Sequence, residues 1–163
     1  MDASLWDSTL GVVADQVAGR EPGPAGVAAA AVAATLGVGL LVKVLEIRGK
    51  RADLRDAARE LAQQLRALAD ADCAAVRAGL KSAEAREIPV RAARYVLRAL
   101  LLCREAAPVA TGLLGADLRA GREILMGAAR AILACAEANL EKAPSAEAGR
   151  EIAELREGLA RLG

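Results

Sequence analysis

The chain has no phenylalanine and no histidine, and Trp6 and Tyr95 are its only aromatic residues. It also has no excess of either charge, because 22 lysines and arginines stand against 21 aspartates and glutamates. Proteins that bind nucleic acid use basic surfaces and aromatic stacking platforms, so we expect no nucleic-acid partner. Without histidine, any acid–base chemistry must use carboxylates, lysine, tyrosine, cysteine or water.

Cysteine is scarce as well, and the chain contains only Cys73, Cys103 and Cys135. They lie about 30 residues apart within helical patterns, whereas zinc ligands commonly come in closely spaced pairs. An odd number of cysteines also cannot form a closed set of disulfides. We interpret all three as small core residues in a reducing, cytoplasmic setting, and we expect no metal and no cofactor.

What the chain has instead is alanine, leucine, arginine and glutamate, which are strong helix formers. A length of 163 residues fits one domain, so we predict a single all-α domain over residues 1–163. We expect a bundle of about six helices, with Pro89 in the first turn of the fourth. The expected helices cover residues 3–18, 25–47, 52–78, 88–106 and 115–140, and the sixth begins after Pro144.

The most apolar segment is Gly26–Val42, in which Thr35 is the only polar residue. It lies at the short limit for a membrane span and is rich in alanine and glycine rather than leucine. It also lacks the basic flank of a signal peptide, so we expect no membrane segment. A helix that is apolar on every side is typical of a buried position, here at the centre of the bundle. Because small side chains offer limited cover for it, we predict a homo-oligomer, with a dimer favoured.

Asp72 continues an apolar stripe whose members recur at alternating steps of four and three, namely Leu54, Ala58, Leu61, Leu65 and Leu68. A buried carboxylate needs a partner, a shifted pKa or a function. Asp72 is therefore a candidate catalytic residue that faces a pocket between helices. The alternatives are an exposed residue near a fraying helix end, or a member of an ion pair.

Lys43 and Glu46 close the most apolar helix and lie three residues apart. This spacing allows a local salt bridge at an exposed helix end. Alternatively, the two residues form the polar rim of a cleft, where Lys43 holds an anionic substrate and Glu46 handles a proton.

Asp117 and Asn139 lie on the fifth expected helix, about 40° apart around its axis at ~100° per residue. They could line a site together, with Asp117 as an acid–base group, or they could simply cap and bridge backbone groups. The loop that carries Gly23 and Gly26 precedes the apolar helix, whose free N–H groups suit an anion. A plain turn is the alternative for this loop.

Several of these segments occur in an order that resembles the cyclodeaminase/cyclohydrolase family, over nearly the whole chain. This family includes the C-terminal domain of formiminotransferase-cyclodeaminase and small bacterial methenyltetrahydrofolate cyclohydrolases. The segments that carry the resemblance are Pro22–Ala29, Asp72–Val76, Ile88–Val90, Ala116–Asp117 and Asn139–Leu140. The resemblance implies an all-α fold, a homodimer, and a folate-like ligand in a helix-lined cleft near the subunit interface.

The resemblance further implies an enzyme that opens or closes the cyclic amidine ring of a tetrahydrofolate derivative, which is its substrate. Asp117, Asp72 and Glu46 are then the catalytic candidates, and Lys43, Gly23, Gly26 and Asn139 the substrate-binding candidates. The family's glycine-rich loop is altered here to Gly23–Gly26, and Ala116 replaces a serine. Two alternatives therefore stay open: a relative acting on a non-folate substrate in specialised biosynthesis, or a non-catalytic helical dimer that binds a ligand or a partner.

Overall fold

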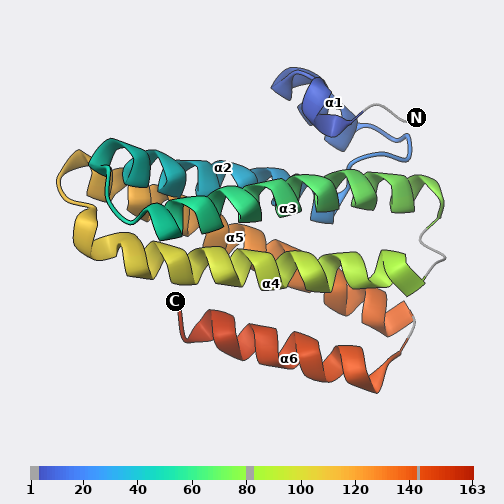
Figure 1. Cartoon of the computed structure of the whole chain (residues 1–163). Coiled ribbons are helices and arrows are strands. Elements are labelled where there is room, and N and C mark those ends of the chain that lie inside the picture. The colour runs from blue at the N-terminus through green and yellow to red at the C-terminus, as the bar shows by residue number, and fades with distance from the viewer. Residues whose placement is uncertain (1–3, 80–82, 143) are drawn as a thin grey trace.

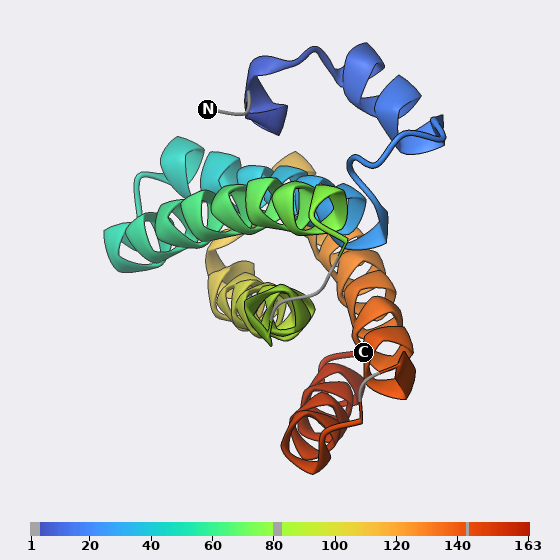
Figure 2. The ribbon, with the colours of Figure 1, turned by 90° about the vertical axis from the view of Figure 1, so that its right-hand side faces the viewer.

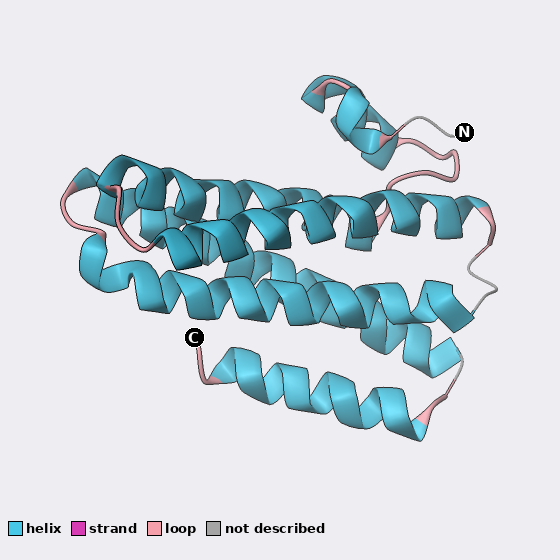
Figure 3. Ribbon diagram, in the orientation of Figure 1, coloured by secondary structure: helices cyan, strands magenta, loops and turns pink. Residues whose placement is uncertain are grey.

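The computed structural model describes residues 4–79, 83–142 and 144–163, and these are helical apart from short connections (Figure 3). A 3-10 helix, η1 (Leu5–Asp7), precedes α1 (Leu10–Ala18), and a second one, η2 (Ala107–Val109), follows α4. The longer helices are α2 (Gly26–Arg48), α3 (Ala52–Arg77), α4 (Ala83–Ala106), α5 (Leu113–Lys142) and α6 (Ala146–Ala160). The predicted all-α class is therefore confirmed for the described residues.

Helices α2, α3, α4 and α5 form a four-helix bundle, and α6 packs along its outer side against α4 and α5 (Figure 1). Helix α1 lies outside the bundle, as the view along the helices in Figure 2 shows. It is attached mainly through Val13, which packs with Leu5, Ala28, Ala69 and Cys73. The N-terminal end of α2 is thus the point where α1, α3 and the bundle meet.

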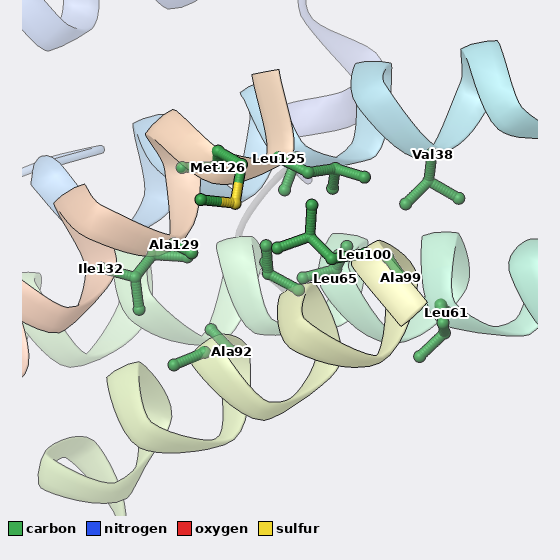
Figure 4. Close-up of a cluster of buried hydrophobic side chains, with 14 of the residues drawn as sticks. Val38, Leu61, Leu65, Ala92, Ala99, Leu100, Leu125, Met126, Ala129 and Ile132 are labelled. Atoms are coloured by element: carbon green, nitrogen blue, oxygen red, sulfur yellow. The ribbon is translucent and has the colours of Figure 1, made fainter. Parts of the chain in front are cut away.

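The core is aliphatic and lies between the four bundle helices (Figure 4). Leu65 of α3, Leu100 of α4 and Leu125 of α5 are almost completely shielded from solvent. Where α2 meets α5, an added Cβ on Gly37 would lie 2.9 Å from the carbonyl oxygen of Gly121. Glycine at this crossing therefore allows the two backbones to approach more closely than any side chain would permit.

Two expected helix boundaries are wrong. Residues 3–18 do not form one helix, because Thr9 caps α1 by accepting the N–H of Val12, and Ser4 likewise caps η1. The fourth helix begins at Ala83 rather than Ile88, so the buried Pro89 lies inside α4 and not in its first turn.

Helix α2 is long and apolar enough to cross a membrane, by length and composition alone. It packs against α3, α4 and α5, which favours the core helix of a soluble protein. The prediction that α2 is enclosed on every side is only partly correct. Of its most apolar 18-residue segment, 56% is buried and the rest is not. One face of α2 remains open in the isolated chain.

Candidate functional site

The carboxyl group of Asp72 lies at the N-terminus of α2. Asp72 is 3% exposed, which confirms the burial predicted from its place on the α3 stripe. Its Oδ2 accepts the backbone N–H of Ala28 at 3.0 Å. Ala25, the residue in the N-cap position of α2, has no side chain that could do this. A carboxylate from α3 therefore caps α2 across the helix interface, where the positive end of the helix dipole favours it.

Burial raises the pKa of Asp72, and the hydrogen bond from Ala28 opposes this effect. The desolvation effect is the larger, so the neutral acid persists to a higher pH than for an exposed aspartate. The second oxygen, Oδ1, has no hydrogen-bond partner among the described residues. Asp72 thus combines a free carboxyl oxygen with a raised pKa, and both properties suit a general acid.

The loop that precedes α2 closes tightly on α5. An added Cβ on Gly26 would lie 2.8 Å from Sγ of Cys135, so no larger residue fits there without movement. Gly23 is half-buried and Pro24 is buried, so this part of the loop is packed into the fold. Burial, and secondarily the charge of Asp72, raises the pKa of the Cys135 thiol. Gly26, Asp72 and Cys135 therefore form one group around the first turn of α2.

Two of the predicted site residues form an ion pair at the opposite end of α2. Nζ of Lys43 lies 2.8 Å from Oδ2 of Asp117, with side chains 53% and 33% exposed. Lys43 follows Ala28 by about 22 Å along α2, at a rise of 1.5 Å per residue. The structure therefore does not bring Asp117 and Asp72 into one crevice within a single chain.

Glu46 is directed away from this pair, toward α3. It binds Arg59 and lies 3.8 Å from Nε of Arg55. The predicted local salt bridge between Lys43 and Glu46 is therefore wrong, because each residue finds its partner on a different neighbouring helix. Neither residue lies near the N-terminus of α2.

A cavity of about 540 Å³ opens between α4, α5 and α6, and Asn139 lines it. Its volume is in the range of small-molecule sites. Arg86, Arg91 and Arg94 also line it, and Arg94 forms an ion pair with Glu151 of α6. Arg86 and Arg91 have no ion-pair partner within the described ranges. Glu87 and Glu147 share the lining, so the cavity offers charges of both signs.

The cavity and the first turn of α2 lie at the same end of the bundle. Asn139 follows Cys135 by one helical turn, about 6 Å along α5. Of the residues predicted to form a site, Asp72, Gly26 and Asn139 therefore gather at this end, while Lys43, Glu46 and Asp117 lie at the other. No group of three histidine, cysteine or carboxylate residues with the geometry of a metal site occurs among the described residues.

The four-helix bundle and the outer sixth helix together have the fold of a known cyclodeaminase structure. The crystal structure of formiminotetrahydrofolate cyclodeaminase from Thermotoga maritima matches with a TM-score of 0.85 and 18% sequence identity. The match covers 97% of this chain and 93% of that chain. Scans of the sequence against family models and curated proteins give no match. The predicted resemblance is thus confirmed at the level of the fold.

Proposed function

We propose that the protein is a small-molecule enzyme that closes or opens a cyclic amidine ring on a folate-like substrate. The fold supports the reaction class, because the similar structure from Thermotoga maritima is named a formiminotetrahydrofolate cyclodeaminase. The observation that carries the proposal on this chain is the buried carboxyl group of Asp72, with its raised pKa and its free Oδ1.

The chemistry needs one group that both gives and takes a proton. When a formimino group closes to the ring, an amine nitrogen attacks the formimino carbon and a new C–N bond forms. The terminal nitrogen must gain a proton before its bond to carbon breaks and ammonia leaves. A neutral Asp72 donates that proton, and the resulting carboxylate then accepts the proton that the attacking nitrogen loses. In the hydrolytic direction the same carboxylate activates water.

We place the rest of such a substrate in the cavity between α4, α5 and α6, which lies at the same end of the bundle as Asp72 but is not lined by it. Folate derivatives carry carboxylates, and Arg86 and Arg91 are the cavity cations without an ion-pair partner among the described residues. Arginine binds carboxylates in a bidentate manner. Asn139 offers an amide to the polar groups of the ligand. In this arrangement Lys43, Glu46 and Asp117 of the same chain do not contact the substrate.

The test is turnover of formiminotetrahydrofolate and of methenyltetrahydrofolate by the purified protein. We expect Asp72→Asn to lower kcat by at least about 100-fold, the typical contribution of a positioned acid–base group. Asp70→Asn is the matched control, because Asp70 lies on the same helix and binds Ser4 and Leu5 instead of α2. Equal turnover by the Asp72→Asn variant would contradict the assignment.

A second candidate function is a ligand-binding protein without catalysis. It is favoured by the structural role of Asp72, which already caps α2 and does not line the cavity beside Asn139. Such a protein would be stabilised by reduced folates or by other cyclic amines without turning them over. Thermal unfolding with each ligand separates the two candidates when it is combined with the turnover assay. Stabilisation by a non-folate amine alone would point to a different substrate.

We also propose that the protein acts in the cytoplasm as a homodimer. Three cysteines without a disulfide suit a reducing compartment. The open face of α2 supports self-association, since large apolar side chains such as Leu36 and Ile47 are exposed there.

A further inference from the structure

The charged side chains that line the cavity between α4, α5 and α6 are three arginines and three glutamates. They are Arg86, Glu87, Arg91, Arg94, Glu147 and Glu151. The first four belong to α4 and the last two to α6. Arg94 and Glu151 form an ion pair with each other, which leaves two cations and two anions. The cavity is therefore balanced in charge, and a ligand meets separate groups of both signs there.

The four remaining charged side chains have no ion-pair partner within residues 4–79, 83–142 and 144–163. Glu87 and Arg91 show this most clearly, because they lie four residues apart on α4. At this spacing a glutamate and an arginine on a helix can pair with each other. They form no such pair in the structure, so both side chains remain available to a ligand.

Apolar side chains lie among these charges on the cavity wall. Val90 of α4 and Ile152 of α6 are buried, and Leu140 of α5 is half-buried. Asn139 adds an amide group, which can donate hydrogen bonds to a carboxylate. Small-molecule sites combine an apolar lining with a few polar groups that fix the orientation of the ligand. The wall of this cavity has that composition.

We propose that the cavity binds a zwitterionic ligand of the amino-acid type, which carries a carboxylate, an ammonium group and an apolar body. Arg86 and Arg91 bind the carboxylate, and Glu87 and Glu147 bind the ammonium group. A ligand with carboxylates alone would leave both glutamates facing a like charge, which is unfavourable. A ligand with an ammonium group alone would leave the arginines in the same position. A zwitterion meets opposite charge at both ends.

This inference narrows the substrate of the proposed function, and it rests on that function only for the role of the ligand as a substrate. The substrate is then a cyclic amidine or formimino compound that carries a free amino-acid group. The tail of a folate ends in carboxylates without an ammonium group, so it satisfies the two arginines and not the two glutamates. The binding itself does not depend on the chemistry at Asp72.

The test is an NMR titration of the ¹⁵N-labelled full chain with three matched ligands. L-Leucine is the zwitterion, 4-methylpentanoate lacks its ammonium group, and 3-methylbutylamine lacks its carboxylate. We expect L-leucine to shift the signals of the cavity residues and to bind at least about tenfold more tightly than either analogue, because each lost contact is a charged hydrogen bond. The folate tail is represented by p-aminobenzoyl-L-glutamate, which should bind more weakly than L-leucine.

Two isosteric variants assign the binding to the cavity. Arg91→Gln and Glu147→Gln should each weaken the binding of L-leucine about tenfold or more. Glu147→Gln should not weaken the binding of 4-methylpentanoate, because that ligand has no ammonium group for Glu147 to bind. Arg98→Gln and Glu154→Gln are the matched controls, since both residues are exposed on the same two helices outside the cavity wall. The controls should bind L-leucine like wild type.

A lack of L-leucine binding would overturn the inference, as would equal affinities for the three matched ligands. Tighter binding of p-aminobenzoyl-L-glutamate, unaffected by Glu147→Gln, would assign the cavity to a folate tail and would overturn it too. Turnover of folates that depends on Asp72 would leave the proposed function standing in each of these cases. Binding of the zwitterion by a protein that turns over no amidine would instead contradict the proposed function and leave the ligand class of the cavity intact.

Discussion

Sγ of Cys135 on α5 packs directly against Gly26, the first residue of α2, so closely that a Cβ at position 26 would lie 2.8 Å away. This contact fixes the first turn of α2 against α5, next to the carboxyl group of Asp72. The position of Asp72, the candidate acid, therefore depends on the contact between the backbone of Gly26 and the thiol of Cys135.

The contact between Gly26 and Cys135 predicts a compensating pair of substitutions. Gly26→Ala should lower the free energy of unfolding by about 1–3 kcal/mol, as expected for overpacking. Cys135→Ala removes the opposing sulfur, so the double variant should recover much of this loss. Urea unfolding of the four proteins gives the coupling free energy, and strictly additive effects would contradict the close contact.

Stability should depend on pH through Asp72. Because burial raises the pKa of Asp72 in the folded state, the folded protein binds this proton more tightly than the unfolded chain. Binding of this proton stabilises the folded state fully below the ordinary aspartate pKa of 3.8. This stabilisation is lost as the pH rises through the raised pKa of Asp72. The asparagine of the Asp72→Asn variant stays neutral at every pH. The urea midpoint of this variant should therefore rise relative to that of wild type from about pH 4 upward. A pH-independent difference between the two proteins would show that the pKa is not raised.

The three cysteines should differ in their reactivity toward alkylating reagents. Burial raises the pKa of Cys103 to about 12, so its thiol stays protonated at neutral pH. Cys135 is half-buried, whereas Cys73 and Cys103 are buried. Mass spectrometry after limited alkylation should find Cys135 modified first and Cys103 modified only on unfolding. Early labelling of Cys103 would contradict the packing described for α4.

The aliphatic core should be sensitive to the loss of single leucines. Leu65 is fully buried between the bundle helices (Figure 4), so Leu65→Ala should cost about 2–5 kcal/mol. Leu101 is 38% exposed on α4, and the same substitution there should cost less than about 1 kcal/mol. Similar losses at the two positions, measured by chemical denaturation, would argue against this placement of α3 and α4.

The spacing of apolar residues in the sequence predicted those features that depend on a single helix. The burial of Asp72 followed from its place on the stripe of α3, because steps of three and four residues define one side of a helix. Its hydrogen bond to Ala28 could not be predicted, because it joins residues that are 44 positions apart. Lys43 and Glu46 show the same limit: their spacing allowed a local pair, but Asp117 and Arg59 on other helices bind them instead.

The arginines of the cavity were missed for a related reason. Arg86, Arg91 and Arg94 have the sequence pattern of an ordinary solvated helix face. The cavity exists only because α6 packs back on α4 and α5, with Arg94 bound to Glu151. A weak signal was present in Ser145, which precedes α6 and caps it by accepting the N–H of Ala148. A cap locates the start of a helix, and tertiary packing decides which surface that helix covers.

The carboxyl group of Asp72 tests the account most directly, through its titration by ¹³C NMR in protein labelled at the aspartate carboxyl carbons. The signal of Asp72 is the one that is absent from the spectrum of the Asp72→Asn variant. It should titrate above the ordinary aspartate range, and a reduced folate should shift its pKa. A titration in the ordinary range that is unaffected by reduced folates would contradict the proposal that this group is the acid of a folate-like site.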